Sequence, residues 1–430
     1  MNYMGRSIAG LAAARLKTEK VLALTGARQT GKTTFCQRIL PELLGRPFTY
    51  ISFDDPDERL RFRDSAVAIL EAIRTPLVVL DEVQKIPSLF DPLKLVADRQ
   101  ERSFGQTEKR FILTGSSQLL LMGRIRESLA GRAALLNLYP FSLSEVSGSR
   151  EASPLSTIWR QGRLDKDVVS RFHALPADSV RTAMRLRDEH QQWGGYPPVW
   201  QRPEGIDKTN WLKDYRRTYI ERDILDVGQV SDIESFILAQ KLLCARTGQI
   251  LSLSEVARDV SLSVNTVKRY VNLLVMSFQC HLLQPYYENA GKRFIKSPKI
   301  YFPDPGLSRS ILGDMSVGTG ALYESWVFSE LIKWRQTEPV EPGLFFYRTS
   351  AGMEIDFLIA EAGKILPVEV KASNKAAHAD AVNIERFMDE HRTHAPAGLI
   401  IYHGRELVEV RKNIWAVPDW YLFGAALDTR

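Results

Sequence analysis

The chain has 430 residues, of which 44% are hydrophobic and 25% charged, and a formal net charge of +6 at pH 7. This composition is typical of a globular protein, and the length predicts about two to four domains. No run approaches the ~18 apolar residues of a membrane helix, and Arg15 and Lys17 interrupt the apolar N-terminal stretch, so we expect no secretory signal. The cysteines, Cys36, Cys244 and Cys280, are scattered and odd in number, which argues against a disulfide framework or a zinc site. We therefore expect a cytoplasmic protein.

A phosphate-binding loop is the first motif of the chain. Residues 21–24 are apolar and predict a buried strand, and the segment GARQTGKT that begins at Gly26 fits G-x-x-x-x-G-K-[ST] in full. In such a loop the backbone N–H groups surround the α- and β-phosphates, and the N-terminus of the next helix faces the anion. Lys32 is expected to reach the β- and γ-phosphates, and Thr33 to bind Mg²⁺ through its hydroxyl. The predicted nucleotide-contacting residues are Gly26, Ala27, Arg28, Gln29, Thr30, Gly31, Lys32, Thr33 and Thr34.

Polar residues also follow two later apolar segments. Residues 77–80 precede Asp81 and Glu82, and residues 111–113 precede Thr114 and Ser116. A strand that ends in two acids after a phosphate-binding loop predicts a Walker B motif, in which Asp81 holds Mg²⁺ and Glu82 activates the attacking water. A hydroxyl at Thr114 or Ser116 is expected to sense the γ-phosphate. Because nothing resembles a guanine-specificity motif, the expected cofactors are ATP and Mg²⁺.

Strand and helix candidates alternate in this part of the chain. Residues 48–53 and 133–138 are further strand candidates, separated from the others by segments of helical pattern. This alternation predicts an α/β fold with a parallel sheet and helices on both faces. Ligands bind at the carboxyl ends of such strands. Since the polar motifs all fall at strand ends, we expect them to form one site.

Three arginines follow the strand candidate that ends at Thr114. They are Arg124, Arg126 and Arg132. An arginine that reaches the γ-phosphate of a neighbouring subunit raises the hydrolysis rate by orders of magnitude. We rank Arg132 first, then Arg126, then Arg124, as candidates for this arginine finger. The alternative for each is a basic helix surface.

Several segments together carry a family resemblance. The segments GARQTGKTT, FDDPDER, VVLDEVQ, FILTGSSQ and SLAGRAALLNLYPFSLSE resemble the bacterial and archaeal AAA+-type ATPases that have a C-terminal region of unassigned function. The resemblance continues in the motif GGYP at Gly194 and implies a homo-oligomer, a hexamer or an open ring, formed through the ATP site. The expected domains are an AAA+-like ATPase domain (1–150), a helical lid or linker (151–235), a winged helix-turn-helix (236–303) and a nuclease-like domain (304–430).

Positive charge gathers in one window of the chain. Residues 241–300 carry nine Lys and Arg against three Asp and Glu, an excess equal to that of the whole chain. Two helix candidates, a turn and two strand candidates in this window resemble a winged helix-turn-helix, with protein interaction as the alternative role to DNA binding. Contacts to DNA are expected mainly at phosphates, with low sequence specificity. The residues expected to make them are Asn265, Thr266, Lys268 and Arg269 on the second helix and Lys292 and Arg293 in the wing.

A second set of acids lies near the C-terminus. Residues 354–360 and 365–371 predict a hairpin that brings Asp356 to Glu369 and Lys371, and an amphipathic helix at 321–335 is expected to add Glu324. The pattern E…D…ExK resembles the PD-(D/E)xK nucleases and implies a restriction-endonuclease-like α/β domain, although the Pro-Asp pair is absent. Carboxylates in this arrangement suit Mg²⁺ or Mn²⁺. The alternative is an inactive fold that binds DNA or supports assembly.

These features lead to one functional hypothesis and two alternatives. We expect an oligomeric DNA-binding AAA+ ATPase that couples hydrolysis of Mg·ATP to remodelling of, or translocation on, duplex or branched DNA. The first alternative is an ATP-gated, metal-dependent DNA nuclease. The second is an ATPase whose nucleotide state regulates assembly without motor activity. No membrane partner is expected.

Overall fold

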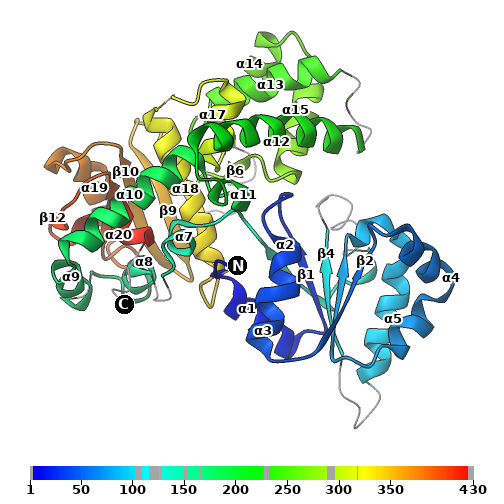
Figure 1. The fold of residues 1–430 in the computed structure, drawn as a ribbon. Coiled ribbons are helices and arrows are strands. Elements are labelled where there is room, and N and C mark those ends of the chain that lie inside the picture. Colours follow the sequence, from blue (N-terminus) through cyan, green and yellow to red (C-terminus); the bar gives the residue numbers. More distant parts are fainter. Residues whose placement is uncertain are drawn as a thin grey trace. The chain divides into compact units, whose positions relative to one another are not determined.

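The chain forms two compact units. The computed structural model describes residues 3–101, 109–115, 125, 127–149, 153–164, 166–226, 230, 232–287, 296–316 and 318–424. One unit consists of residues 1–140 with 276–278, and the other of residues 141–275 with 279–430 (Figure 1). The helix α7 (Leu143–Ser147) therefore belongs to the second unit, although the expected first domain extended to residue 150. The expected division of the rest into three domains stays a prediction.

The first unit is built on a parallel sheet. Its five strands lie in the order β2-β3-β4-β1-β5, and every neighbouring pair is parallel. The strands β1 and β3, which precede the phosphate-binding loop and the acidic pair, are separated by β4 alone. The sequence patterns of this region are thus realised as the expected α/β sheet. The strands are β1 (Val21–Thr25), β2 (Phe48–Ser52), β3 (Leu77–Asp81), β4 (Arg110–Thr114) and β5 (Ala133–Asn137).

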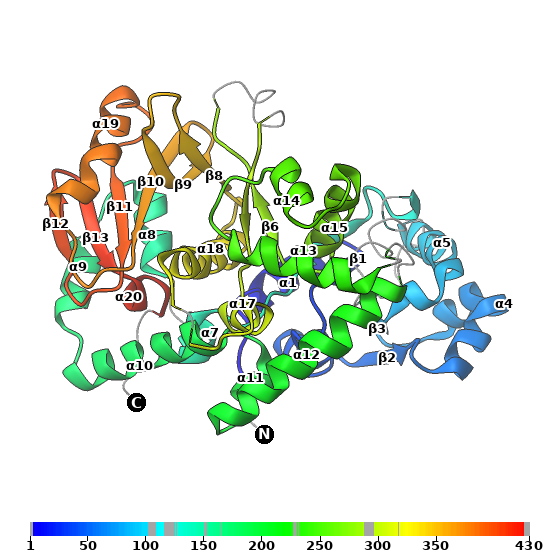
Figure 2. The ribbon, with the colours of Figure 1, turned by 90° about the horizontal axis from the view of Figure 1, so that it is seen from above.

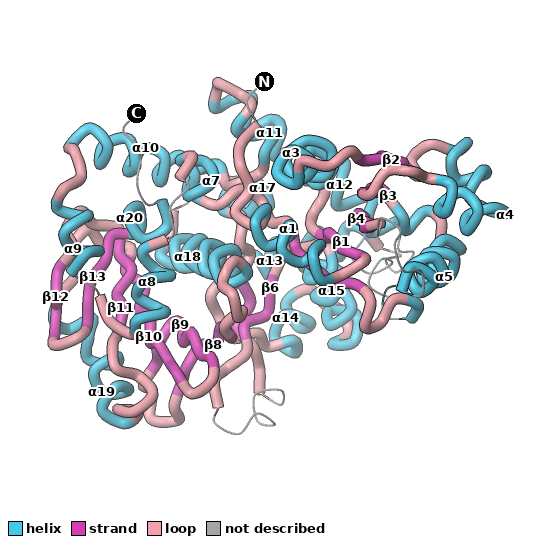
Figure 3. The backbone as a smooth tube through the Cα atoms, turned by 90° about the horizontal axis from the view of Figure 1, so that it is seen from below, coloured by secondary structure: helices cyan, strands magenta, loops and turns pink. Residues whose placement is uncertain are grey.

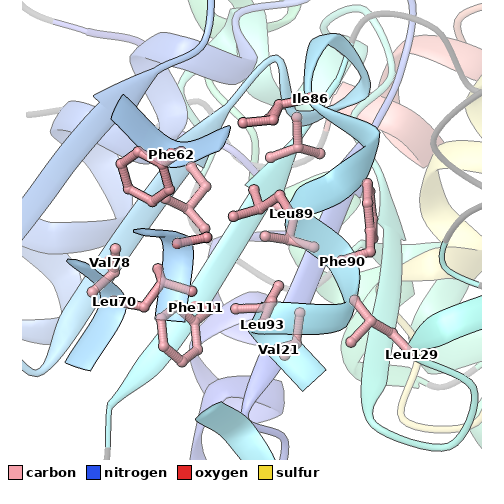
Figure 4. Packing of buried hydrophobic residues seen from close by; sticks show 14 of the residues in the cluster. Val21, Phe62, Leu70, Val78, Ile86, Leu89, Phe90, Leu93, Phe111 and Leu129 are labelled. Carbon is pink, nitrogen blue, oxygen red and sulfur yellow. The ribbon is translucent and has the colours of Figure 1, made fainter. Parts of the chain in front are cut away.

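Helices cover both faces of this sheet. On one face, α4 and α5 bury Phe62, Leu70 and Leu93 against strand residues such as Val78 and Phe111 (Figure 4). On the other face, α1 and the helix after the phosphate-binding loop pack against the sheet. Both faces of the strands are therefore apolar, as parallel strands require. The helices are α1 (Ala9–Thr18), α2 (Lys32–Thr34), α3 (Leu40–Leu44), α4 (Pro56–Ala72) and α5 (Phe90–Glu101), with 3₁₀ turns η2 (Val83–Lys85) and η3 (Pro87–Leu89).

The helix after the phosphate-binding loop contains a wider turn. Between α2 and α3 the segment η1 (Phe35–Ile39) is π-helical. Pro41 follows it and has no N–H to donate to the carbonyl one turn earlier. The altered hydrogen-bond spacing therefore has a local sequence cause, and π segments of this kind are frequent near functional sites.

The second unit contains a mixed sheet. Its strand order is β12-β13-β11-β10-β9-β8. The pairs β10·β11 and β11·β13 are parallel, whereas β8·β9, β9·β10 and β12·β13 are antiparallel. The predicted hairpin is therefore present as β9 and β10 within the sheet. The strands are β8 (Gly343–Arg348), β9 (Glu354–Glu361), β10 (Lys364–Lys371), β11 (Gly398–Tyr402), β12 (Val408–Arg411) and β13 (Ile414–Pro418).

Two groups of helices enclose this sheet. Helix α19 (Val382–Glu390) packs on one face through Ile384, and α18 (Gly320–Gln336) and α20 (Asp419–Gly424) lie on the other face (Figure 2). The sequence predicted an amphipathic helix for α18, and this was wrong, because neighbours surround α18 and bury residues on all its sides. Further helices of the unit are α8 (Pro154–Gln161), α9 (Lys166–His173), α10 (Ala177–Trp193), α11 (Pro197–Trp200), α12 (Gly205–Asp226), α17 (Pro305–Leu312) and the 3₁₀ turn η4 (His378–Ala381).

The basic window folds as three helices and a strand pair. Helices α13 (Ile233–Ala245), α14 (Leu253–Asp259) and α15 (Val264–Met276) precede β6 (His281–Leu283) and β7 (Lys299–Tyr301), which pair antiparallel (Figure 3). Ser252 and Ser263 accept N-terminal hydrogen bonds from the backbone of α14 and α15. Two successive helices and an antiparallel strand pair therefore lie at the expected positions, and their identity as a winged helix-turn-helix stays a prediction. Among the described residues, no helix is both long enough and apolar enough to cross a membrane.

Candidate functional sites

The phosphate-binding loop closes around the side chain of Lys32. Its Nζ donates to the carbonyl oxygens of Gly26 at 2.8 Å and Ala27 at 2.9 Å. Burial lowers the pKa of Lys32 to about 8, while Glu82 and Asp81 act in the opposite direction. The lysine therefore lies at the centre of the loop, where the strand β1 ends.

The start of the loop has room only for glycine. Gly26 has φ +147°, and a Cβ on it would lie 2.3 Å from the carbonyl oxygen of Leu138. A side chain there would collide with the segment that follows β5, whose Leu138 N–H donates to Thr25. Close packing against Leu138 thus explains why the first residue of the motif is glycine, which the motif alone did not show.

Three side chains converge on the carboxylate of Asp81. Thr33 donates to its Oδ2 at 3.2 Å, Tyr50 donates to the same oxygen at 2.5 Å, and Thr114 donates to Oδ1. Lys32 acts on the same region from the loop, because Asp81 is one of the charges that raise its pKa. The carboxylate at the end of β3 is thus joined to β2, to the end of β4 and, through Thr33, to α2. Thr33 and Asp81 lie together, as expected for residues that share one Mg²⁺.

Glu82 adopts a backbone conformation that few residues other than glycine adopt. Its φ is +55°, in the left-handed region, and its carboxylate accepts a hydrogen bond from Gln84. Strained positions of this kind concentrate at functional sites. The left-handed turn at Glu82 follows the end of β3 at Asp81.

Two residues of this site were missed by sequence reasoning. Arg6, from the N-terminal segment, is buried, and its guanidinium donates to the carbonyl oxygens of Thr30 (2.8 Å) and Tyr139. It thereby ties the phosphate-binding loop to the chain that follows β5. Tyr50 holds Asp81 from the neighbouring strand β2. A lone arginine in a tail and a tyrosine in a strand carry no motif, so no local signal identifies either residue.

The predicted residues of this site do not all fall within the described part of the chain. Ser116, Arg124 and Arg126 lie outside the described residues. Arg132 is described, and both its Nε and Nη2 donate to Asp98 of α5, at 2.6 and 3.2 Å. These hydrogen bonds from Arg132 lower the pKa of Asp98. The preferred arginine finger is thus held by a partner in its own unit, and its action on a neighbouring subunit stays a prediction.

The second helix of the basic window carries an exposed polar face. Asn265, Lys268 and Arg269 are exposed, whereas Val267 and Tyr270 are buried. The hydroxyl of Thr266 lies 2.8 Å from that of Ser263 and is thus engaged at the start of α15. Lys292 and Arg293 lie outside the described residues.

Two charges of the basic window do not belong to a basic surface. Arg246 lies 2.6 Å from Asp259, and Lys299 is buried with only 4% of its surface exposed. The positive surface is therefore smaller than the residue count indicated, because folding turns some of these side chains inward.

The acids of the C-terminal region lie on neighbouring elements of the second unit. The β9·β10 register, which pairs Phe357 with Val368, places Asp356 opposite Glu369 when it is extended by one residue. Asp356 accepts a hydrogen bond from the N–H of Val370 at 2.8 Å, and Lys371 lies 2.9 Å from Glu369. Helix α18 brings Glu324 to the same place.

Burial and neighbouring charges shift the pKa of each of these acids. Burial and the neighbouring charge of Asp356 raise the pKa of Glu324 to about 7 and that of Glu369 to about 7. Burial also raises the pKa of Asp356, while Lys299 and the N–H of Val370 lower it. Nevertheless, among the described residues no three His, Cys, Asp or Glu side chains are arranged to hold a metal ion. The acids are neighbours, but their oxygens are not gathered around one point.

Lys299 and Glu354 complete this cluster and were not predicted. The Nζ of Lys299 lies 2.8 Å from Glu354 and 3.6 Å from Glu324. The sequence contained one signal for this contact, the lysine at the start of the apolar segment KIYF. A charged residue in a buried strand requires a partner of opposite charge. The partner itself lies on elements distant in sequence and has no local signature.

Comparison with known families divides the chain in three. Residues 18–147 match the family described as an AAA domain. Residues 184–317 and 319–422 match two families described as domains of unknown function. The first match and the loop geometry agree: this segment is an AAA-type P-loop domain. The two later matches have no assigned activity.

Whole-chain relatives have no assigned activity either. An uncharacterized protein of Mycobacterium tuberculosis is 28% identical over 376 residues, which are 84% of this chain and 74% of that protein. An uncharacterized protein of Methanocaldococcus jannaschii is 22% identical over 363 residues, which are 82% and 75% of the two chains. Both alignments extend well beyond the AAA-type domain.

Solved structures resemble this chain weakly. The Aeropyrum pernix ORC2 protein in its ADP form has a TM-score of 0.32 and 12% identity, and the alignment covers 72% of this chain and 93% of that one. A Thermotoga maritima RuvB mutant has a TM-score of 0.29 and 16% identity, with 68% and 95% covered. Scores this low carry no argument about the function of this chain.

Proposed function

We propose that this protein is an oligomeric, DNA-directed ATPase. The observation that carries the proposal is the convergence of Thr33, Tyr50 and Thr114 on Asp81, beside the loop that holds Lys32. A loop that binds phosphate, a hydroxyl and a carboxylate for Mg²⁺, and a second acid at the same strand end are the parts that ATP hydrolysis needs. The residues therefore fit Mg·ATP.

The residues of the loop and the strand ends would divide the work of hydrolysis. Bound Mg²⁺ would supply charge neutralisation at the β- and γ-phosphates. Lys32 would exchange its contacts with Gly26 and Ala27 for phosphate oxygens, and the loop N–H groups would hold the anion. Thr33 and Asp81 would hold the cation, and Glu82 would orient the attacking water for in-line displacement. Thr114, in contact with Asp81, would transmit the state of the γ-phosphate to the end of β4.

The exposed face of α15 supports DNA as the partner. Asn265, Lys268 and Arg269 project from the second helix of a helix–turn–helix, and a strand pair follows that helix. Lysine and arginine at such a face contact phosphates, so binding would fall steeply with salt and depend little on sequence. Homo-oligomerisation through the ATP site rests on the family resemblance alone.

The deciding experiment is ATP hydrolysis measured with and without DNA. Duplex, single-stranded and four-way-junction DNA are added in parallel, at the same nucleotide concentration and at moderate salt. We expect at least one DNA form to stimulate hydrolysis and Lys32→Ala to abolish turnover while retaining DNA binding. Slow hydrolysis that no DNA changes, without DNA binding, would contradict the proposal. If, in addition, nucleotide changed the molecular mass measured by light scattering, the results would favour an ATPase whose nucleotide state regulates assembly.

A metal-dependent nuclease is the second candidate function. The mutual influence of the charges of Glu324, Asp356 and Glu369, with Lys371 paired to Glu369, favours it, although the present arrangement of the described residues does not form a metal site. Its test is incubation of plasmid and branched DNA with Mg²⁺ or Mn²⁺, with and without ATP. Cleavage by the wild-type protein and none by Asp356→Ala would support it, whereas equal nicking by both would indicate contamination.

A further inference from the structure

The buried side chain of Lys299 enters the acidic cluster from outside the hairpin. Lys299 lies on β7, the second strand of the pair that follows α15. Its Nζ contacts Glu354 of β9 at 2.8 Å and faces Glu324 of α18 at 3.6 Å. It is also the strongest favourable charge acting on Asp356. One ammonium group thus pairs with two carboxylates on two different elements, α18 and β9.

The strand β7 engages Glu324 at two points. Residues two apart in a strand share one face, so Lys299 and Tyr301 project together. The hydroxyl of Tyr301 donates to Oε1 of Glu324 at 2.5 Å, and Lys299 faces this same oxygen. The aromatic ring of Phe346 in β8 covers the ammonium, with Nζ 5.6 Å from the ring centroid. One carboxylate oxygen of Glu324, a predicted metal ligand, is therefore occupied by groups of this chain.

The buried carboxylates of the acidic cluster require a compensating positive charge, and the lysines of the chain provide it. A buried carboxylate is costly unless a positive charge or a hydrogen bond compensates it. Lys371 forms an ion pair with Glu369, and Lys299 forms ion pairs with Glu354 and Glu324. The positive charge of Lys299 also lowers the pKa of Asp356. A divalent ion that used Glu324 and Asp356 would have to approach an ammonium of the same sign within a few ångströms.

We propose that Lys299 is the resident cation of the nuclease-like site and closes it to divalent metal ions. In this conformation the ammonium lies between Glu324 and Glu354, and a metal binds only when Lys299 leaves. Because Lys299 lies on β7, entry of a metal is coupled to the strand pair beside α15. This inference rests on the nuclease-like site of the second candidate function, and it does not involve the ATP site.

The test measures Mn²⁺ binding to the full chain. The electron paramagnetic resonance signal of free Mn²⁺ decreases as the ion binds, and this decrease gives the affinity. An Asp81→Asn background removes a cation ligand of the ATP site, and no nucleotide is added. Lys299→Met removes the charge, and Lys299→Arg is the matched control that keeps it. We expect Lys299→Met to bind Mn²⁺ about tenfold tighter or more, and Lys299→Arg to bind like the parent, since repulsion between like charges at this range is strong. Adding Asp356→Asn should abolish the gain.

Equal Mn²⁺ affinity of the parent and Lys299→Met would overturn the proposal, as would a gain that survives Asp356→Asn. If Lys299→Met fails to fold, a second experiment uses the wild-type chain. Its lysines are acetylated chemically, and mass spectrometry measures how fast each lysine reacts. Lys299 should then be protected without metal and become reactive at high Mn²⁺, with exposed Lys412 as the unprotected control. Rapid labelling without metal, or protection that Mn²⁺ never relieves, contradicts the inference.

The outcomes also separate this inference from the nuclease hypothesis. Cleavage that depends on Asp356 in the wild-type protein, together with tight Mn²⁺ binding, would support the nuclease and reject a closed site. A gain of binding in Lys299→Met without cleavage by the wild type would support the closed site alone.

Discussion

At the scale of single residues, the ATP site depends on a hydroxyl that no motif contains. Tyr50 donates to Asp81 from β2, and burial followed by this hydrogen bond raises the pKa of Tyr50, so its proton stays in place. A hydrogen bond to a charged group contributes about 1.5–3 kcal/mol. The orientation of the predicted Mg²⁺ ligand is therefore set in part by the neighbouring strand.

We expect Tyr50→Phe to lower ATP turnover about tenfold, because the loss of about 1.4 kcal/mol in positioning corresponds to that factor. Thr49→Val is the matched control, since Thr49 lies on the same strand but its hydroxyl contacts Thr75 on the other face. Steady-state hydrolysis at saturating Mg·ATP measures both variants. Unchanged turnover in Tyr50→Phe, or an equal loss in Thr49→Val, would show that this hydrogen bond is unimportant.

A second residue-scale prediction concerns His190 in the second unit. Its Nε2 lies 2.8 Å from the carbonyl oxygen of Phe141, and its Nδ1 accepts from the indole of Trp326 at 2.8 Å. Both contacts fit the neutral ring with its proton on Nε2. Burial lowers the pKa of His190 to about 4, below the value of about 6.5 in an unfolded chain. The unfolded state therefore binds more protons between these two pH values.

The free energy of unfolding should consequently fall as the pH drops from 6.5 towards 4, by roughly 3 kcal/mol from His190 alone. Burial lowers the pKa of His281 in the same way, to about 4, so wild-type protein carries two such contributions. Urea unfolding at several pH values checks this. In His190→Gln, the fall in the free energy of unfolding that the two buried histidines cause between pH 6.5 and 4 should be roughly halved. His378 is exposed, so His378→Gln should show the full fall. Parallel pH profiles for His190→Gln and wild type would reject the assignment.

At the scale of elements, helix α15 combines a buried side with an exposed basic one. Val267, Val271 and Leu274 pack inward, and Lys268 and Arg269 face solvent. The same 3.6-residue period thus serves the core and the proposed DNA surface. Val264, at the start of the helix, is apolar, but 46% of its surface is exposed.

The double variant Lys268→Glu, Arg269→Glu should bind DNA more weakly. Each phosphate contact that is lost should also reduce the slope of log K against log[salt] by about 0.9 for duplex DNA. Fluorescence anisotropy over a salt series measures affinity and slope together. Lys412→Glu, an exposed charge reversal in the turn between β12 and β13, is the control and should change neither. Equal weakening in the control would mean that net charge, and not α15, determines binding.

At the scale of the whole molecule, the ATP site and the acidic cluster belong to different compact units. Residues 1–140 hold Lys32, Thr33 and Asp81, whereas Glu324, Asp356 and Glu369 lie in the second unit. Each unit has its own sheet and its own apolar core. Chains of this kind depart from two-state unfolding.

We therefore expect two thermal unfolding transitions, of which Mg·ADP shifts only the one that belongs to residues 1–140. A ligand at 100 times its dissociation constant stabilises the state that binds it by about 2.7 kcal/mol. Differential scanning calorimetry with and without Mg·ADP tests this, and Lys32→Ala should remove the shift. A single transition that moves as a whole would show that the two units unfold together.

The sequence by itself determined the features that depend on neighbours along the chain. The phosphate-binding loop, the acids after β3 and the hairpin with Asp356 and Glu369 follow from local backbone geometry and from strand or helix periodicity. These patterns predicted the parallel sheet of the first unit and the mixed sheet's hairpin correctly. The AAA-type domain was likewise predictable from its motifs, because each motif is a short run of adjacent residues.

Only the tertiary structure decided which side chains meet across distant elements. The contact of Tyr50 with Asp81, the pairing of Arg132 with Asp98 and the insertion of Lys299 among the acids each join segments more than 20 residues apart. Burial makes such contacts strong, because a charge removed from water requires a partner. The sequence alone, however, does not indicate which distant residue is that partner. The acidic cluster is therefore a predicted set of residues whose cation, an ammonium from β7, was found only in the folded chain.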